Sequence, residues 1–282
     1  MMKSSCSNII SLIKSYLELC KFKVVALMLF SAVVGMLLSN KILLSWQTSI
    51  IALFGICLLA CSGGAINQII DQKLDKKMAR TQNRPIPQGK IKTTNATFVA
   101  CILALAGIYT LWLNTNPLAT YLTIASMFGY AIIYTVVLKY ITPQNIVIGG
   151  LTGAMPPLLG WVALTGNIAP EPILLVLIIY VWTPPHFWAL AIAKNNEYKK
   201  SSVPMLPTTH GIYFTKLNIL LYTILVMLVT LLPYVINMFG ITYLCITIIL
   251  NIRFIYLAIC LYLEESDNFA MPTFLFSITY LI

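Results

Sequence analysis

The residues best suited to chemistry follow directly on a long apolar run near the first quarter of the chain. Asn67, Asp71 and Asp75 recur at every fourth position, so on a helix they lie one above another on a single face. Two carboxylates and an amide oxygen are hard ligands of the kind that divalent cations such as Mg²⁺ prefer. Arg80 and Arg84 come next, and guanidinium groups bind phosphates through charge-assisted hydrogen bonds. The pattern predicts a metal-bridged polyphosphate site at the end of a membrane helix.

A competing interpretation is that the charged stretch, residues 67–92, only anchors a helix at lipid headgroups. That interpretation accounts well for four lysines of the stretch, which are Lys76, Lys77, Lys90 and Lys92. It does not account for Asp71, because ionisable groups at the depth of an apolar run are costly and usually functional. We therefore favour a binding site for the acids and arginines, and anchoring for the lysines.

Composition identifies the class of protein that must position these residues. Of the 282 residues, 59% are hydrophobic and only 9% are charged, and several apolar runs reach the roughly 20 residues that cross a bilayer. We expect a polytopic membrane protein with one transmembrane domain, residues 1–282. The net charge of +10 would suggest nucleic acid in a soluble protein, but in this class it reflects basic cytoplasmic loops. No nucleic-acid partner is expected.

The apolar runs predict an all-α bundle of about nine transmembrane helices around a central cavity. The expected spans are residues 24–38, 50–70, 96–113, 118–138, 146–164, 173–193, 217–236 and 241–263, and residues 269–282 form a short ninth helix. Glycines and prolines in the fifth span suit close packing around a cavity. Residues 1–23 are polar to amphipathic and are expected on the cytoplasmic surface.

Charge asymmetry orients this bundle. With the N-terminus inside, all of the 18 lysines and arginines except Lys41 and Arg253 fall in the N-terminal segment or on the turns after even-numbered spans. Cytoplasmic loops carry such an excess, so both polar loops, after spans two and six, are expected on the cytoplasmic face. The N-terminus has neither a signal-peptide nor a transit-peptide pattern, which favours a bacterial inner membrane.

Several motifs together resemble one family. The pattern N-x-x-x-D-x-x-x-D followed by M-x-R-T-x-x-R-P, from Asn67, resembles the UbiA superfamily of intramembrane prenyltransferases. Three later segments resemble its branch that farnesylates haem. They are G-x-x-G-A-x-P-P-x-x-G from Gly150, W-x-x-P-H-F from Trp182 and V-P-M-L-P from Val203. The resemblance covers roughly residues 21–240.

The resemblance implies a reaction. A farnesyl group would pass from farnesyl diphosphate to the 2-vinyl group of haem B, with a hydroxyl from water, giving haem O for terminal oxidases. It also implies roles for residues. Asp71 and Asp75 would be catalytic and, with Asn67 and Glu197, would hold Mg²⁺. Diphosphate would bind to Asn67, Arg80, Arg84 and Lys194. A downstream haem A synthase or an oxidase assembly is a further expected partner.

Glu197 departs from the superfamily pattern. The superfamily has a second acidic motif facing the first, and in the haem branch it is reduced, usually to an Asp before Tyr; here Glu197 precedes Tyr198. A carboxylate on a longer arm still suits a metal. The competing interpretation is a solvated loop acid beside Lys194, Lys199 and Lys200.

His186 and its aromatic neighbours are candidates for the acceptor site. A lone histidine in an apolar helix is usually a packing residue, but the family carries one here, and imidazole is a natural ligand of haem iron. A general acid–base role is the alternative. Trp161, Trp182, Phe187 and Trp188 are candidates to line a pocket for the prenyl chain and porphyrin, although most aromatic residues pack against lipid. His210 is expected to be an ordinary surface residue.

Two rival functions remain open. A UbiA-type prenyltransferase of a quinone precursor or chlorophyllide would share the first motif but should carry a fuller second D-x-x-x-D. A membrane transporter would place ionisable residues along a pathway near the midplane, whereas the acids here cluster at one face.

Overall fold

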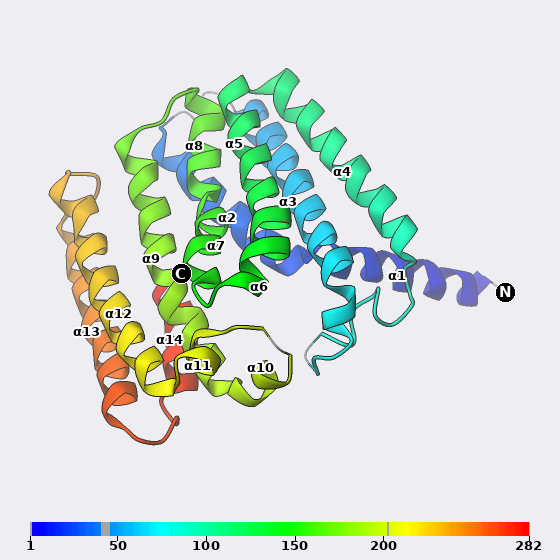
Figure 1. Cartoon of the computed structure of the whole chain (residues 1–282). Coiled ribbons are helices and arrows are strands. Elements are labelled where there is room, and N and C mark those ends of the chain that lie inside the picture. The colour runs from blue at the N-terminus through cyan, green and yellow to red at the C-terminus, as the bar shows by residue number, and fades with distance from the viewer. Residues whose placement is uncertain (1, 41–45, 80, 202, 282) are drawn as a thin grey trace. The chain divides into compact units, whose positions relative to one another are not determined.

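The computed structural model describes residues 2–40, 46–79, 81–201 and 203–281, with side chains for residues 10–40, 46–79, 81–199 and 203–281. Every regular element in that part of the chain is a helix, as Figure 1 shows, which confirms the predicted all-α class. The helices are α1 (Met2–Leu19), α2 (Phe22–Leu38), α3 (Trp46–Asp75), α4 (Thr93–Asn114), α5 (Pro117–Phe128), the π-helical segment η1 (Gly129–Leu138), α6 (Lys139–Ile141), α7 (Asn145–Ala154), α8 (Pro156–Thr165), α9 (Pro170–Ala193), α10 (Asn195–Ser201), α11 (Leu206–Thr209), α12 (Ile212–Val235), α13 (Ile241–Leu263) and α14 (Ala270–Leu281).

The helices are long and apolar enough for a multi-pass membrane protein. Among the described residues, seven helical segments can cross a bilayer, or eight if the bent pair Ile10–Leu19 and Phe22–Leu38 forms one span. The two parts of that pair meet at 59°. Helix α14 is a shorter apolar helix of 12 residues, fewer than the roughly 20 residues that cross a bilayer.

Three elements differ in detail from the prediction. Helix α3 continues through Asp75, past the expected end at residue 70. The fourth span changes from α-helix to π-helix at Gly129. Helix α12 begins at Ile212 and carries Lys216, which was expected in a polar loop, into a buried position. There its Nζ donates to the carbonyl oxygen of Glu264 at 2.8 Å and pairs with Asp267 at 3.2 Å, contacts that local sequence does not reveal.

The chain divides into two compact units. The first unit comprises Met1–Val137 and Met155–Ile168, and the second comprises Leu138–Ala154 and Ala169–Ile282. The single domain expected over residues 1–282 stays a prediction.

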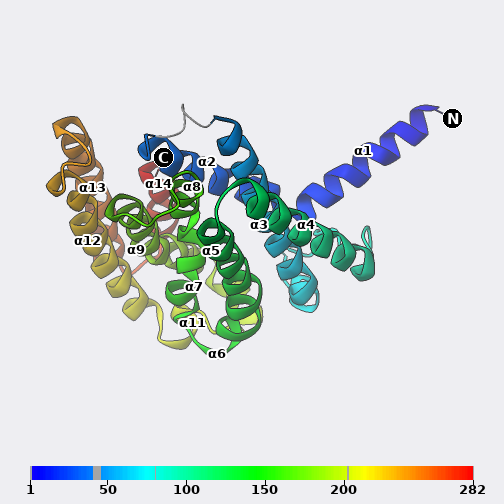
Figure 2. The same cartoon turned by 90° about the horizontal axis from the view of Figure 1, so that it is seen from above.

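Small residues allow close helix packing in the first unit. A Cβ on Gly35 of α2 would collide with the carbonyl oxygen of Pro157 on α8, and one on Gly160 of α8 with that of Ala32 on α2. Small residues at helix crossings are typical of membrane proteins because they let backbones approach. Figure 2 shows α1 of the same unit extending as an arm beyond α3 and α4.

The second unit is built on α9, α12, α13 and α14. Its core includes Val181, Val226, Phe254 and Tyr280. Within this core the Tyr280 hydroxyl donates to Asn251 Oδ1 at 2.8 Å, so the short helix α14 is fixed by a buried polar contact as well as by apolar packing.

Candidate active site

Asn67, Asp71 and Asp75 lie on the last turns of α3, and we call these three side chains the ladder. All three are buried, each at most 3% exposed. The amide nitrogen of Asn67 donates to Oδ2 of Asp71 at 3.1 Å, as expected for side chains four residues apart on one helical face. Buried carboxylates must be paired, hydrogen-bonded or bound to a cation. The ladder is therefore a concentration of negative charge held in place by neighbouring polar groups.

Arg84 forms an ion pair with Asp75, the last residue of this ladder. Its Nη1 lies 2.8 and 2.7 Å from the two carboxylate oxygens of Asp75. The chain reverses between them through turns, in which the Thr81 hydroxyl donates to the Asp75 carbonyl oxygen at 3.1 Å. The guanidinium thus lies next to the Asp75 carboxylate, where it can also bind a phosphate. Arg80, the other predicted phosphate ligand, lies outside the described residues.

Lys21 also reaches the ladder, although its sequence position indicated only a basic residue at the cytoplasmic surface. Its Nζ donates to Oδ1 of Asn67 and, at 2.9 Å, to the hydroxyl of Tyr130. Lys21 has φ +53° at the bend between α1 and α2, a conformation uncommon for a residue other than glycine. The preceding residue, Cys20, packs its carbonyl against Gly64 of α3, where a Cβ would come within 2.7 Å. This close approach brings the bend against α3.

The π-helical segment η1 supplies two further side chains that the sequence pattern did not identify. Thr135 is fully buried; its hydroxyl accepts from Asn67 Nδ2 at 2.9 Å and donates to the Tyr130 carbonyl oxygen at 2.9 Å. Isolated π-helical turns are rare and often occur at functional sites. The five residues Lys21, Asn67, Asp71, Tyr130 and Thr135 form what we call the Asn67 network.

The donor set of the ladder fits Mg²⁺. Its carboxylate and amide oxygens are hard ligands, and Mg²⁺ is commonly held by one or two carboxylates, with substrate phosphates and water completing its shell. Across the described part of the chain, no group of three or more His, Cys, Asp or Glu side chains is arranged to hold a metal ion. Substrate phosphates and water would complete the shell of a metal held by the ladder.

His186 lies in α9 within a cluster of aromatic rings. Trp182 stacks on the imidazole at 4.3 Å between ring centroids, Phe274 lies at 4.7 Å, and Phe187 meets it edge-on at 5.0 Å. Nδ1 of His186 lies 2.7 Å from the Ser277 hydroxyl, and Trp182 Nε1 donates to the Ser277 carbonyl oxygen at 2.8 Å. The structure thus brings Trp182, Phe187 and His186 together, and their role in a haem or prenyl pocket stays a prediction.

The remaining candidates have simpler surroundings. Trp188 is fully buried and packs edge-on against Tyr222 at 5.4 Å, which identifies it as a core residue of the second unit. Trp161, in the first unit, has a buried Nε1 without a hydrogen-bond partner in the described part of the chain. Lys194 and Glu197 pair with each other at 3.4 Å and are both partly exposed. Their roles at a site stay predictions, and His210 is exposed as expected.

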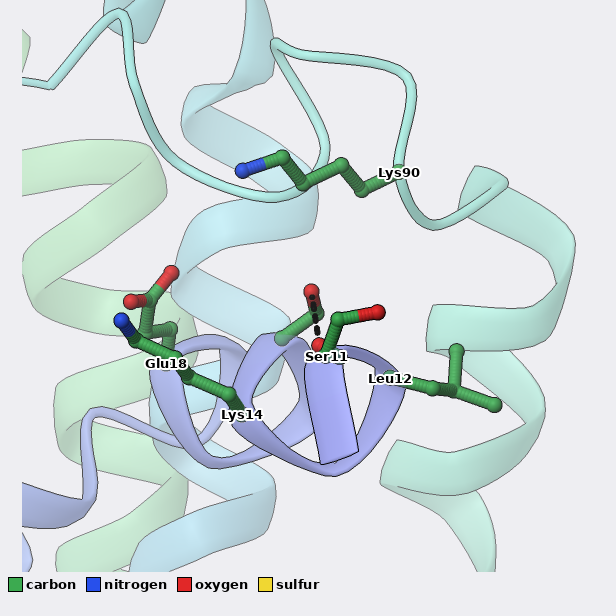
Figure 3. Close-up of a pocket in the computed structure, with 6 residues that line it drawn as sticks. Ser11, Leu12, Lys14, Glu18 and Lys90 are labelled. Atoms are coloured by element: carbon green, nitrogen blue, oxygen red, sulfur yellow. Dashed lines mark hydrogen bonds between the residues drawn. The ribbon is translucent and has the colours of Figure 1, made fainter. Parts of the chain in front are cut away.

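A groove of about 560 Å³ lies elsewhere on the first unit, between α1 and the loop before α4 (Figure 3). It is lined by Ser11, Leu12, Lys14, Ser15, Glu18 and Lys90. Figure 3 shows Lys90 extending from the loop above the polar side chains of α1. None of the ladder residues lines this groove.

Comparison with known proteins gives a consistent result. Residues 28–279 match the model of the UbiA prenyltransferase family. The chain is 52% identical over 268 residues to a protein from Thioalkalivibrio sulfidiphilus named protoheme IX farnesyltransferase, covering 95% of this chain and 89% of that protein. It is 50% identical over 269 residues to a protein of the same name from Hahella chejuensis, covering 95% and 90%.

Solved structures share the fold. A structure of digeranylgeranylglyceryl phosphate synthase superimposes with a TM-score of 0.82 at 25% identity, covering 96% of this chain and 95% of that one. A UbiA homologue from Archaeoglobus fulgidus bound to DMAPP and Mg²⁺ gives a TM-score of 0.69 at 15% identity, covering 95% and 96%.

Proposed function

The chain belongs to the UbiA prenyltransferase family, and we propose that it transfers a farnesyl group from farnesyl diphosphate to haem B, giving haem O. The observation that carries this proposal is the likeness, near 50% identity over almost the whole chain, to proteins named protoheme IX farnesyltransferase. The chemistry of the two residue clusters supports it, one suited to a diphosphate and the other to a porphyrin.

The Asn67 network and Arg84 are the groups proposed to bind the diphosphate. Asp71 and Asp75, with Asn67, would hold Mg²⁺, as the same fold holds Mg²⁺ with an isoprenyl diphosphate in the Archaeoglobus fulgidus homologue. When bound, Mg²⁺ supplies positive charge that neutralises the charge growing on the diphosphate leaving group. Glu197 is proposed as an additional metal ligand.

Cationic side chains would stabilise the same leaving group. Arg84 would add charge-assisted hydrogen bonds to phosphate oxygens, and Arg80 and Lys194 are proposed to do the same. Lys21 joins this set because its ammonium group already lies on the amide oxygen of Asn67. A partly buried lysine there raises the positive potential where diphosphate must bind.

His186 and the aromatic rings around it are the groups proposed to bind the acceptor. The imidazole would bind the haem iron, and Trp182 and Phe187 would contact the porphyrin or the prenyl chain. Trp161 is proposed to line the prenyl pocket. Flat, apolar side chains suit both ligands because they bury apolar area and stack on the macrocycle.

The proposed reaction breaks one carbon–oxygen bond and forms one carbon–carbon and one new carbon–oxygen bond. The C1–O bond of farnesyl diphosphate breaks, and its electron pair leaves with diphosphate. The π electrons of the 2-vinyl group attack the allylic cation, which forms a carbon–carbon bond and moves the positive charge to the carbon beside the porphyrin ring. Water adds there and loses one proton to solvent, leaving a hydroxyl. Apolar side chains protect the first cation from water.

We also propose that the protein lies in a bacterial inner membrane with its N-terminus and active-site loops in the cytoplasm. Nearly all basic residues fall on one side. The exposed apolar side chains of α1, including Ile10 and Ile13, suit the boundary of the bilayer. Lys14 and Lys90 in the adjacent groove would meet lipid phosphates. A downstream haem A synthase or oxidase assembly would consume the product.

A competition assay tests the acceptor. Purified protein in detergent receives radiolabelled farnesyl diphosphate, Mg²⁺ and equal amounts of haem B and an aromatic quinone precursor, and the products are separated by chromatography. The label should move to haem. Label in the quinone precursor, with haem recovered unchanged, would assign the chain to another branch of the family. Substrates that cross a proteoliposome membrane without reaction would instead favour a transporter.

A further inference from the structure

The Ser277 hydroxyl lies between an oxygen on its own helix and a nitrogen on α9. Its Oγ is 2.6 Å from the carbonyl oxygen of Phe274 and 2.7 Å from Nδ1 of His186. A carbonyl oxygen can only accept, and a serine hydroxyl has one proton to donate. Two oxygens 2.6 Å apart require that proton between them. Nδ1 of His186 must therefore carry its own proton and donate it to Ser277, which leaves the imidazole lone pair on Nε2.

The surroundings of His186 oppose any rearrangement of this hydrogen bond. Trp182 stacks on the imidazole with 22° between the ring planes, and Phe274 lies across it at 33°. Trp182 is in turn tied to the Ser277 carbonyl oxygen through Nε1. Ser277 therefore contacts both the imidazole and the ring that stacks on it, so a flip of the His186 ring must break the hydrogen bond and pass through orientations in which the stacking is lost.

Helix α14 itself is fixed at both ends. Beyond Ser277, the Tyr280 hydroxyl donates to the buried Asn251 at 2.8 Å. Before the helix, buried Lys216 binds the carbonyl oxygens of Glu264 and Ser266 at 2.8 and 3.2 Å. Ser277 is fully buried between these anchors. Helix α14 is thus anchored beside α9 on both sides of Phe274, so its polar groups have defined positions.

We propose that Ser277 is a positioning residue that fixes His186 as the Nδ1–H tautomer, so that Nε2 presents its lone pair to the iron of the porphyrin substrate. A neutral imidazole binds iron through a bare nitrogen, and ligating histidines almost always donate their other N–H to a fixed acceptor. The ring remains partly exposed, as a substrate ligand requires. The role toward iron rests on the proposed function, whereas the tautomer does not.

The tautomer is tested without haem. Protein labelled with nitrogen-15 histidine is reconstituted in lipid and measured by solid-state NMR, and the signals of His186 are identified by their loss in His186→Ala. The wild type should show a protonated Nδ1 and an unprotonated Nε2. In Ser277→Ala the signals should move toward a mixture of tautomers. A protonated Nε2 in the wild type, or the same spectrum in both proteins, would overturn the proposal.

The role toward iron is tested by titration with ferric haem B followed by the Soret absorbance. Loss of a hydrogen-bond partner of a ligating histidine typically weakens metal binding by about 10- to 100-fold, and we expect this in Ser277→Ala. The matched control is Thr273→Val, because Thr273 is buried one turn earlier in α14 and its hydroxyl donates only to the Phe269 carbonyl oxygen among the described contacts. The control should bind haem like the wild type. The role toward iron is overturned if neither His186→Ala nor Ser277→Ala changes the affinity for haem. In that case the NMR result on the tautomer would still hold, and only the proposed contact with haem would fail.

Discussion

Thr135→Val removes one hydroxyl from the Asn67 network while keeping the size of the side chain. In the wild type that hydroxyl accepts from Asn67 Nδ2 and donates to the Tyr130 carbonyl oxygen, both at 2.9 Å. Valine offers neither contact, so one N–H of the buried amide loses its acceptor. The side-chain amide of Asn67 is then less firmly fixed in the orientation in which Oδ1 accepts from Lys21 and Nδ2 donates to Asp71. The ladder therefore becomes less well ordered.

The size of the effect follows from the burial. Thr135 and Asn67 are at most 3% exposed, so water cannot readily replace the lost contact. A buried donor without a partner costs about 1–3 kcal/mol. Asn67 lies where diphosphate must be oriented, so we expect this free energy to be lost from the stabilisation of the transition state. Since each 1.4 kcal/mol is a factor of ten in rate, kcat should fall by about 5- to 150-fold.

Steady-state kinetics with haem B, farnesyl diphosphate and Mg²⁺ measure this loss, beside thermal unfolding of the same preparation. The matched control is Thr123→Val, since Thr123 is buried in the adjoining helix α5 and its hydroxyl donates to the Ala119 carbonyl oxygen at 2.7 Å, away from the site. Both variants should lose similar stability, but only Thr135→Val should lose turnover. Equal kcat in the two variants would refute a role for the network in catalysis.

Four further results are expected. Asp71→Asn should abolish turnover, because an amide lacks the negative charge with which a carboxylate holds a divalent cation; retained turnover would remove Asp71 from the metal site. Chelation of divalent cations should stop the reaction and added Mg²⁺ should restore it, whereas full activity in the chelator would exclude a metal requirement. Arg84→Gln leaves Asp75 without its guanidinium, and loss of charged hydrogen bonds worth about 1.5–3 kcal/mol should raise the KM for farnesyl diphosphate by about 10- to 150-fold; an unchanged KM would place Arg84 outside the phosphate site. Gly64→Ala brings a Cβ within 2.7 Å of the Cys20 carbonyl oxygen and should destabilise the protein by about 1–3 kcal/mol, while Gly63→Ala, with its nearest atom at 3.4 Å, should not; equal melting temperatures would contradict the close packing of the bend on α3.

The ladder was predictable because its information is local. Positions four residues apart on a helix meet whatever the rest of the chain does, so Asn67 and Asp71 could be paired from their spacing alone. The apolar runs likewise predicted the spans, because the thickness of a bilayer sets their length.

The partners of the ladder were not predictable in this way. Lys21 lies 46 residues before Asn67 in sequence, and its side chain enters the network only because the chain bends at φ +53°. Thr135 lies in the π-helical segment η1, and its contact with Asn67 joins residues 68 positions apart. Neither the bend nor the π-helical segment leaves a periodic signal in the sequence.

Ser277 illustrates a different limit. Its helix was recognised, but its length alone indicated an incomplete span. The contact with His186 joins residues 91 positions apart, and a serine in an apolar helix gives no sign of its partner. Only the packing of α14 against α9 reveals that the hydroxyl holds the imidazole.

A single turnover in oxygen-18-labelled water tests the central claim most directly. Purified protein is mixed with haem B, Mg²⁺ and farnesyl diphosphate, and the haem fraction is analysed by mass spectrometry. We predict haem that has gained one farnesyl group and one labelled hydroxyl, with release of one diphosphate. Haem recovered without a farnesyl group, or a farnesylated haem whose oxygen is unlabelled, would contradict the account.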